Sequence, residues 1–401
     1  MSALGPDSTS ELPAVEPLAA RPAREPRSTT AGPPEAESGG VLTVDLAAIE
    51  ANWRSLSRRT LPSECAAVVK ADAYGCGIEQ VGRALSRAGC KTFFVADLSE
   101  ARRLRAVSFD ATIYVLNGLM PGTAAAFAEI QARPVIGSLA ELAEWDAFVS
   151  GNNWQGGAAL HVDTGMNRLG VSAEEAAAIA PRIRSENHGI TLLMSHLACA
   201  ELPDHPLNER QIKLFREIRM LYRGIPGSLA NSPGIFLGQS AYCDMVRPGA
   251  ALFGVNPTPG RSNPMRSVIE LRGRVAQVRS VTRGETVGYD AQWTAGRSAR
   301  IAIVAVGYAD GYLRAASASD TVAGGEAIVA GKRCRLAGRV SMDLLAIDIS
   351  DLAPDAVRRG DMVTLIGEEF TVDDLAATAG TIGYEVLTSL GRRYHRVYRA
   401  E

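Results

Sequence analysis

The stretch TFFVADLSEARRLRAVSFDATIYVLNG, residues 92–118, decides the fold, because two short apolar runs flank a segment with helical patterning. Similar runs recur along the chain: AAVVK (66–70), RPVIGS (133–138), GAALHVDTG (157–165) and TLLMSH (191–196). Strands that alternate with helices predict a parallel sheet. Roughly 20 to 30 residues separate successive runs and no GxGxxG turn follows the first strand, which favours an α/β fold of the (β/α)8 barrel type over an open sheet.

The barrel is predicted to span residues 41–270. Beyond it the chain changes to short β-rich runs broken by Gly, Asp and Arg, with little helical periodicity until VDDLAATAG (372–380). This texture predicts a second, mostly β domain over residues 271–401.

Residues 1–40 differ from both parts. They hold seven of the 20 prolines and no aromatic residue, so they offer little apolar surface to offset the entropy lost on ordering. We expect a disordered tail. A transit peptide is the alternative, but six acidic residues against three arginines oppose it.

The overall composition restricts the class of protein. Apolar residues make up 46% of the chain and charged residues 21%, and the formal net charge is −2, which disfavours nucleic acid and anionic lipid as partners. No run of 18 apolar residues and no secretory start occurs, so a cytoplasmic protein without a membrane segment is expected. The six cysteines form no CxxC pair, which indicates reduced thiols rather than disulfides or a structural metal site.

Lys70 is the first candidate for chemistry. It ends an apolar strand, so its amine would emerge at the rim where barrel enzymes carry their catalytic groups. A lysine there can form a Schiff base once its pKa is lowered. On the local sequence alone, a solvated lysine that closes a strand is the commoner situation, and Tyr74 could equally be a packing aromatic.

Further candidates follow later strands. In HVDTGMNRLG (161–170), Arg168 could orient a carboxylate, and His196 ends TLLMSH, where a buried core histidine is the commoner case. Asn231 and Ser232 precede DMVRPGAALFG (244–254), whose small residues expose the closely spaced N–H groups that suit a phosphate. The alternative for Arg247 is an arginine that closes a surface turn.

Taken in series, these motifs resemble one family. AVVKADAYGCG, HVDTGMNRLG, SHLACA, ANSPG, DMVRPGAALFG, GETVGYDAQW, VGYADGYLR, GRVSMDLLAID and TIGYEVLTSLGRRY occur in the order and spacing of alanine racemase. The resemblance covers residues 41 to about 398 and leaves the tail without a counterpart.

The resemblance implies a barrel that binds pyridoxal 5′-phosphate (PLP), a β domain to which the first strand also contributes, and a head-to-tail homodimer with shared active sites. Lys70 resembles the lysine that forms the aldimine with PLP, Arg247 the group facing the pyridine nitrogen, and His196 the imidazole beside the ring. The remaining cofactor contacts implied are Tyr74, Arg168, Asn231, Ser232, Gly249, Ala250 and Tyr384.

Racemisation requires one acid–base group on each face of the substrate. The resemblance assigns these roles to Lys70 and to Tyr289 of the partner subunit, with the phenol activated through His196 and Arg247. It further implies that Arg168 and the backbone of Met342 hold the substrate carboxylate. Tyr308 and Asp343 are implied at the substrate entrance.

The implied reaction is the interconversion of L-alanine and D-alanine, which would supply peptidoglycan synthesis or alanine catabolism. A broad-specificity racemase, a decarboxylase of the same fold type and a PLP-binding protein without turnover are alternatives. The tyrosine of GETVGYD opposes decarboxylation, and the second domain opposes the non-catalytic protein. His161 departs from the family, which often has a modified lysine there, so we expect an anion or another side chain to orient Arg168.

Overall fold

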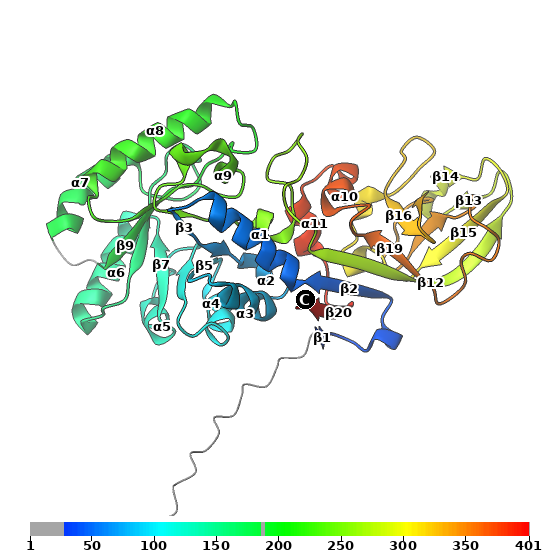
Figure 1. Ribbon diagram of the computed structural model, residues 1–401, viewed down its shortest axis with the longest axis horizontal. Coiled ribbons are helices and arrows are strands. Elements are labelled where there is room, and N and C mark those ends of the chain that lie inside the picture. Colours follow the sequence, from blue (N-terminus) through cyan, green and yellow to red (C-terminus); the bar gives the residue numbers. More distant parts are fainter. Residues whose placement is uncertain (1–27, 186–188, 401) are drawn as a thin grey trace, which may run out of the picture.

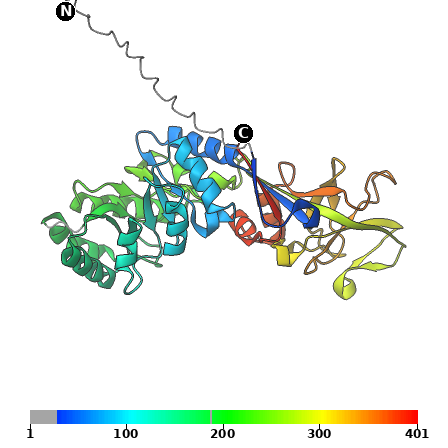
Figure 2. The same ribbon diagram turned by 90° about the horizontal axis from the view of Figure 1, so that it is seen from below.

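The computed structural model describes residues 28–185 and 189–400. They form an elongated molecule with a barrel at one end and a sheet-rich domain at the other (Figures 1 and 2). Strand β2 (Gly40–Asp45) belongs to the sheet-rich domain and leads directly into helix α1 (Leu46–Arg59) of the barrel. Helix α1 begins at Asp45, whose carboxylate accepts the N–H of Ala48 at 2.8 Å.

The predicted (β/α)8 barrel is confirmed. Its parallel strands follow the order β3-β11-β10-β9-β8-β7-β6-β5-β4, and Ala66 alone separates β3 from β4, so the two ends of this sheet are halves of one strand and the barrel closes. The strands are β3 (Glu64–Cys65), β4 (Ala67–Val68), β5 (Thr92–Val95), β6 (Thr112–Val115), β7 (Ala132–Ile136), β8 (Ala158–His161), β9 (Ile190–Met194), β10 (Gly227–Ser228) and β11 (Met245–Val246).

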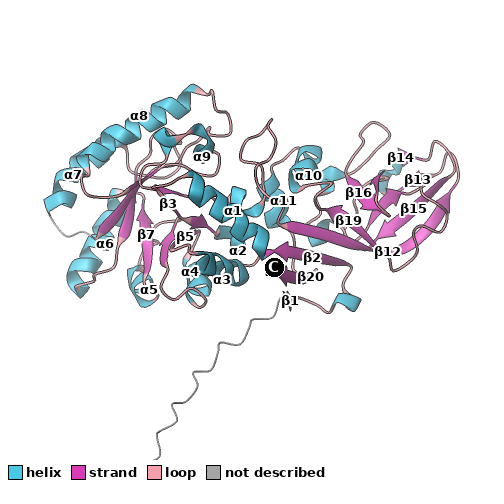
Figure 3. Ribbon diagram, viewed as in Figure 1, coloured by secondary structure: helices cyan, strands magenta, loops and turns pink. Residues whose placement is uncertain are grey.

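Helices surround the barrel strands (Figure 3). After α1 they are α3 (Ile78–Ala88), α4 (Leu98–Arg105), α5 (Ala124–Glu129), α6 (Leu139–Asn152), α7 (Ala173–Ser185), α8 (Pro206–Leu221) and α9 (Gly234–Leu237). Helix α1 buries Ile49, Trp53 and Leu56 against the barrel, and the Trp53 indole N–H donates to the Cys65 carbonyl at 3.1 Å. This bond fixes the first helix to the strand that closes the ring.

The second domain is mostly β, as expected. Its main sheet has the order β1-β20-β2-β12-β19-β16-β17, with β15 on β12 and β18 on β15. The strands not yet given are β12 (Ile269–Val281), β15 (Ala299–Val304), β16 (Glu326–Val329), β17 (Lys332–Arg335), β18 (Leu345–Asp348), β19 (Met362–Ile366) and β20 (His395–Arg399). Strand β13 (Thr286–Val287) pairs with β14 (Trp293–Thr294) in a separate small sheet. The helices of this domain are α10 (Val372–Ala379) and α11 (Gly383–Ser389).

Part of the predicted disordered tail is ordered. Strand β1 (Ser28–Ala31) pairs antiparallel with β20, and a short 3-10 helix covers Glu35–Glu37. The prediction was wrong for residues 28–40, because a strand at a sheet edge is held by backbone hydrogen bonds and needs little apolar surface of its own. The rest of the predicted tail, 1–27, lies outside the described residues.

The two domains meet beside the carboxyl end of β4. The Arg396 guanidinium, from β20, donates to the Gly75 carbonyl at 2.6 Å. A Cβ on Gly75 would lie 2.4 Å from the Leu387 carbonyl oxygen of α11, so only glycine allows this approach. The turn after Lys70 is therefore packed between the domains.

Candidate active site

A cavity of about 780 Å³ opens at the carboxyl ends of the barrel strands, next to α11. Ten of the residues predicted to bind a cofactor line this one cavity: Lys70, Tyr74, Arg168, His196, Asn231, Ser232, Arg247, Gly249, Ala250 and Tyr384. Parallel strands direct their carboxyl ends to the same rim of a barrel, which explains how residues between 70 and 250 converge. Tyr384 joins them from α11 of the sheet-rich domain.

Lys70 stands at the start of the short element α2 (Lys70–Tyr74), which is a left-handed turn. Ala71, Asp72, Ala73 and Tyr74 have φ between 53° and 55°, a conformation that disfavours L-residues by roughly 1–2 kcal/mol each. Burial lowers the pKa of Lys70, the Arg168 cation lowers it further, and the Glu100 carboxylate opposes both. A lowered pKa leaves more of the amine neutral and able to take up a proton.

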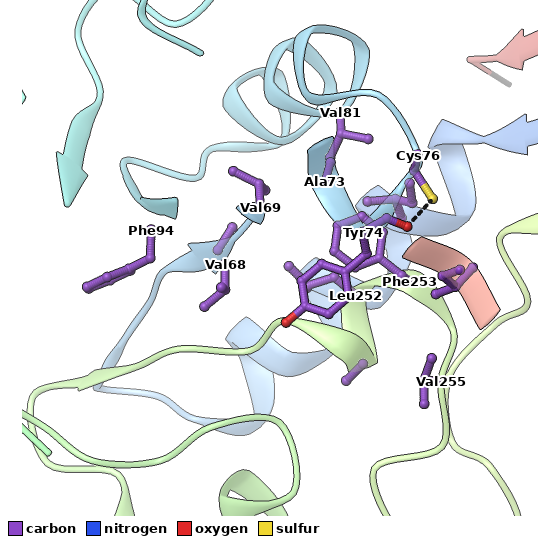
Figure 4. Packing of buried hydrophobic residues seen from close by; sticks show 14 of the residues in the cluster. Val68, Val69, Ala73, Tyr74, Cys76, Val81, Phe94, Leu252, Phe253 and Val255 are labelled. Carbon is purple, nitrogen blue, oxygen red and sulfur yellow. Dashed lines mark hydrogen bonds between the residues drawn. The ribbon is translucent and has the colours of Figure 1, made fainter. Parts of the chain in front are cut away.

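Tyr74 is packed so that its hydroxyl meets the backbone of Gly249. Its ring stacks on Phe253 with centroids 4.8 Å apart, beside Leu252 (Figure 4). A Cβ on Gly249 would lie 2.3 Å from the Tyr74 hydroxyl oxygen, so a larger residue would displace the ring. Burial raises the pKa of Tyr74, which keeps the hydroxyl as a hydrogen-bond donor.

Ser232 organises the same corner. Its hydroxyl accepts the N–H groups of Gly249 at 2.9 Å and Ala251 at 3.2 Å, at the start of the 3-10 helix Ala250–Phe253. The Asn231 side chain accepts the Gly234 N–H at 3.0 Å. Closely spaced backbone N–H and hydroxyl groups of this kind, with the Tyr74 hydroxyl beside Gly249, fit a phosphate.

Tyr384, from α11, adds a third hydroxyl from the β domain. It donates to the Glu201 carboxylate, and burial followed by this bond raises the pKa of Tyr384. This bond connects the sheet-rich domain with the loop after β9 across the cavity.

Arg247 is 3% exposed and forms the cationic floor of the cavity. It donates to the Ser228 hydroxyl at 2.5 Å and the Ser195 carbonyl at 2.6 Å, and its Nη2 lies 3.5 Å from His196 Nδ1. Burial lowers the pKa of Arg247 to about 10, so the group stays charged at neutral pH.

Both histidines of the cavity are neutral. Burial and the Arg247 cation lower the pKa of His196 to about 3, and the same causes lower that of His161 to about 4. Each is therefore an uncharged imidazole in the folded protein at neutral and mildly acidic pH.

Arg168 follows a loop built on Asp163, whose carboxylate accepts the N–H groups of Gly165, Met166 and Asn167 at 2.9 Å each. Arg168 is exposed, and among the described residues no hydrogen bond joins it to His161. The expectation that an anion or another side chain orients Arg168 stays a prediction.

Sequence reasoning missed Gln211, which is fully buried on α8. Its Nε2 donates to the His196 carbonyl at 2.9 Å and to the Thr164 hydroxyl at 3.2 Å, and its Oε1 accepts the Ala198 N–H at 2.9 Å. It thus fixes the loop that carries His196. A glutamine within a helical pattern gives no signal for such a role.

Four predicted residues do not line this cavity. Tyr289 is 66% exposed, Tyr308 and Met342 are also exposed, and Asp343 pairs with Arg393 at 2.8 Å. All four belong to the sheet-rich domain, where the Tyr308 N–H donates to Ser341 and the Ala309 N–H to Met342. The chain therefore does not bring Tyr289 to its own Lys70.

Known proteins are similar to this chain along nearly all of its described residues. Residues 44–257 match the family model for the alanine racemase N-terminal domain, and residues 268–398 match that for the C-terminal domain. An alanine racemase of Methylobacterium nodulans is 53% identical over 360 residues, which cover 90% of this chain and 96% of that protein. One from Methylobacterium sp. strain 4-46 is 51% identical over 360 residues, with 90% and 98% covered.

A solved structure shows the same architecture. The crystal structure of alanine racemase from Bartonella henselae with covalently bound pyridoxal phosphate superposes with a TM-score of 0.84 at 35% identity, and the match covers 90% of this chain and 99% of that one.

Proposed function

This chain belongs to the alanine racemase family and interconverts L-alanine and D-alanine with PLP as cofactor; we propose that Lys70 and Tyr289 are its two proton carriers. The observation that supports this assignment is the separation of the two residues. Lys70 lines the cavity, whereas Tyr289 lies exposed on the other domain, so in our proposal Tyr289 reaches the cavity of a second copy.

The residues of the cavity fit the cofactor. Bound PLP supplies delocalisation of the electron pair that remains when the α-proton leaves. Lys70 would hold the cofactor covalently, Arg247 would face its ring nitrogen, and His196 and Asn231 would lie beside it. The phosphate would be held by Tyr74, Ser232, Tyr384 and the backbone of Gly249 and Ala250.

Lys70 is suited to move a proton because its neutral form is accessible. Burial and the Arg168 cation lower its pKa, and a base works best when its pKa approaches the working pH. Arg247 complements it, because a guanidinium that stays charged donates hydrogen bonds and cannot accept a proton from a ring nitrogen.

Tyr289 requires a head-to-tail homodimer in our proposal. Exposed apolar side chains lie at both surfaces that would meet: Leu169 and Ile382 at the cavity, and Met342 and Leu344 near Tyr308 on the sheet-rich domain. Exposed apolar residues gathered in this way are typical of interfaces. In such a dimer the partner's loops would complete the site.

The substrate carboxylate would be held by Arg168 and the backbone of Met342 from the second copy, with Tyr308 and Asp343 at the entrance. The described helices include none that is long and apolar enough to cross a membrane. We propose a cytoplasmic location, supported by six cysteines that are all free thiols. The D-alanine formed would serve peptidoglycan synthesis or alanine catabolism.

Mixing two inactive variants tests the shared site. We expect Lys70→Ala and Tyr289→Phe to be inactive alone, because each lacks one proton carrier in every site. After subunit exchange, half of the dimers would be mixed and would hold one intact site of two, so roughly a quarter of the wild-type activity should return. Activity that stays absent after verified exchange would contradict a tyrosine supplied by the partner.

A further inference from the structure

The left-handed turn after Lys70 depends on bonds from outside itself. Within the turn, the Ala73 N–H donates to the Val69 carbonyl at 2.9 Å and the Gly75 N–H to the Ala71 carbonyl at 2.8 Å. The N–H of Asp72 instead donates to a side chain, Oε1 of Glu100, at 3.0 Å. Since L-residues disfavour this conformation, such an external contact contributes directly to keeping it.

Glu100 is built into the rim rather than exposed on it. It is 8% exposed and lies in the first turn of α4, after Asp97, which caps the helix. Its second oxygen, Oε2, accepts the N–H of Ala96 at 2.8 Å. One buried carboxylate therefore joins the end of β5 to the turn that carries Lys70.

A second side chain of α4 supports the same turn. The Asp72 carboxylate accepts the Ile78 N–H at 3.0 Å and the Arg103 guanidinium at 2.7 Å, and Arg103 also bonds Glu79 at 2.6 Å. Arg103 is more than a third exposed, so its ion pairs contribute less than the buried bond to Glu100.

We propose that Glu100 is a positioning residue for Lys70: its buried carboxylate holds the left-handed turn that directs the amine into the cavity and sets Tyr74 against Gly249. Nothing in the assigned chemistry requires Glu100 to touch cofactor or substrate, and it does not line the cavity. The inference rests on the proposed role of Lys70 as the residue that holds PLP.

Glu141 offers a matched control, because it repeats the same arrangement at a neighbouring unit of the barrel. It lies in the first turn of α6 after Ser138, and its carboxylate accepts the N–H groups of Gly137 at 3.2 Å and Leu119 at 3.1 Å. The loop that it holds carries no group assigned to proton transfer.

The test compares Glu100→Ala, Glu100→Gln, Glu141→Ala and Glu141→Gln as PLP-loaded proteins. Hydrogen–deuterium exchange of the peptide that covers residues 71–77 reports the turn, and loss of the visible absorbance of bound PLP on dilution reports its retention. In Glu100→Ala we expect the exchange rate at 71–77 and the rate of PLP release each to rise at least about tenfold. In Glu100→Gln both rates should rise less, because the amide keeps one acceptor oxygen. Both Glu141 variants should leave exchange at 71–77 within about twofold of wild type.

Wild-type exchange at 71–77 and wild-type PLP release in the Glu100 variants would overturn the proposal. An equal acceleration at 71–77 in the Glu141 variants would also overturn it, since the effect would then be general loosening of the rim. Should Glu100→Ala fail to fold, Glu100→Gln decides alone. A Lys70→Ala protein that retains the absorbance of covalently held PLP would instead refute the role of Lys70, whatever the exchange data show.

Discussion

Arg247 lies with its Nη2 3.5 Å from Nδ1 of His196, and the arginine has no carboxylate partner among the described residues. Its guanidinium donates instead to the Ser228 hydroxyl and to the Ser195 and Leu229 carbonyls, and lies over the Phe94 ring. A cation held this way keeps the neighbouring imidazole neutral, because a second positive charge in a buried site is strongly disfavoured. The proposed activation of Tyr289 would thus use a neutral His196.

The buried histidines should make the fold sensitive to acid. An unfolded histidine has a pKa near 6.5, whereas the pKa of His161 is lowered to about 4 in the folded protein. Between these values the unfolded state binds a proton that the folded state does not, so stability falls as the pH drops from about 6.5 to 4. His161→Asn should reduce this loss by up to about 3 kcal/mol at pH 4.

Urea unfolding at a series of pH values measures this effect. His205→Asn is the control, because His205 is exposed. A pH dependence that is the same in His161→Asn and wild type would show that His161 does not contribute to acid sensitivity.

Gly249→Ala should displace Tyr74, since the new methyl would lie 2.3 Å from the tyrosine hydroxyl oxygen. We expect a loss of about 1–3 kcal/mol in the free energy of unfolding and weaker PLP retention. Denaturant unfolding measures the free energy of unfolding, and dialysis against buffer without PLP measures the retention of PLP. Gly296→Ala serves as control, because a Cβ there meets nothing within 4 Å; equal behaviour of the two variants would contradict the packing argument.

Ser232→Ala should weaken PLP binding by a factor of about 10 to 150, because it removes a hydroxyl proposed to bind the phosphate, and a hydrogen bond to a charged group contributes about 1.5–3 kcal/mol. The same hydroxyl also accepts the N–H groups of Gly249 and Ala251. Equilibrium dialysis of PLP measures the change, with Thr378→Ala on α10 as an exposed-hydroxyl control. Unchanged affinity would remove Ser232 from the proposed phosphate contacts.

Gln211→Ala should destabilise the fold by about 2–4 kcal/mol, since it leaves a buried cavity and unpaired backbone groups at His196 and Ala198. Thermal and urea unfolding measure the loss. Gln155→Ala, at an exposed position, should stay within about 0.5 kcal/mol of wild type. A Gln211 variant as stable as wild type would mean that the His196 loop does not need this side chain.

Much of the fold was predictable because its signals are local. Runs such as TFFVAD and TIYVLNG become β5 and β6, and an apolar run of four or five residues is a sufficient signal for a buried strand. Strands β10 and β11 were missed, since each is two residues long and has no periodicity to detect. They exist because their neighbours in the ring offer unpaired backbone groups.

The sequence by itself determined the alternation of strands and helices, the change to a sheet-rich second half, and the motifs that end at one rim of the barrel. Only the tertiary structure decided that Ser28–Ala31 pairs with β20, that Lys70 is followed by a left-handed turn, and that Glu100 and Gln211 hold the loops of the site. The physical reason is the separation along the chain over which each kind of interaction acts. Periodicity and turn chemistry act between near neighbours in the chain, whereas these hydrogen bonds join groups whose meeting depends on how distant segments fold together.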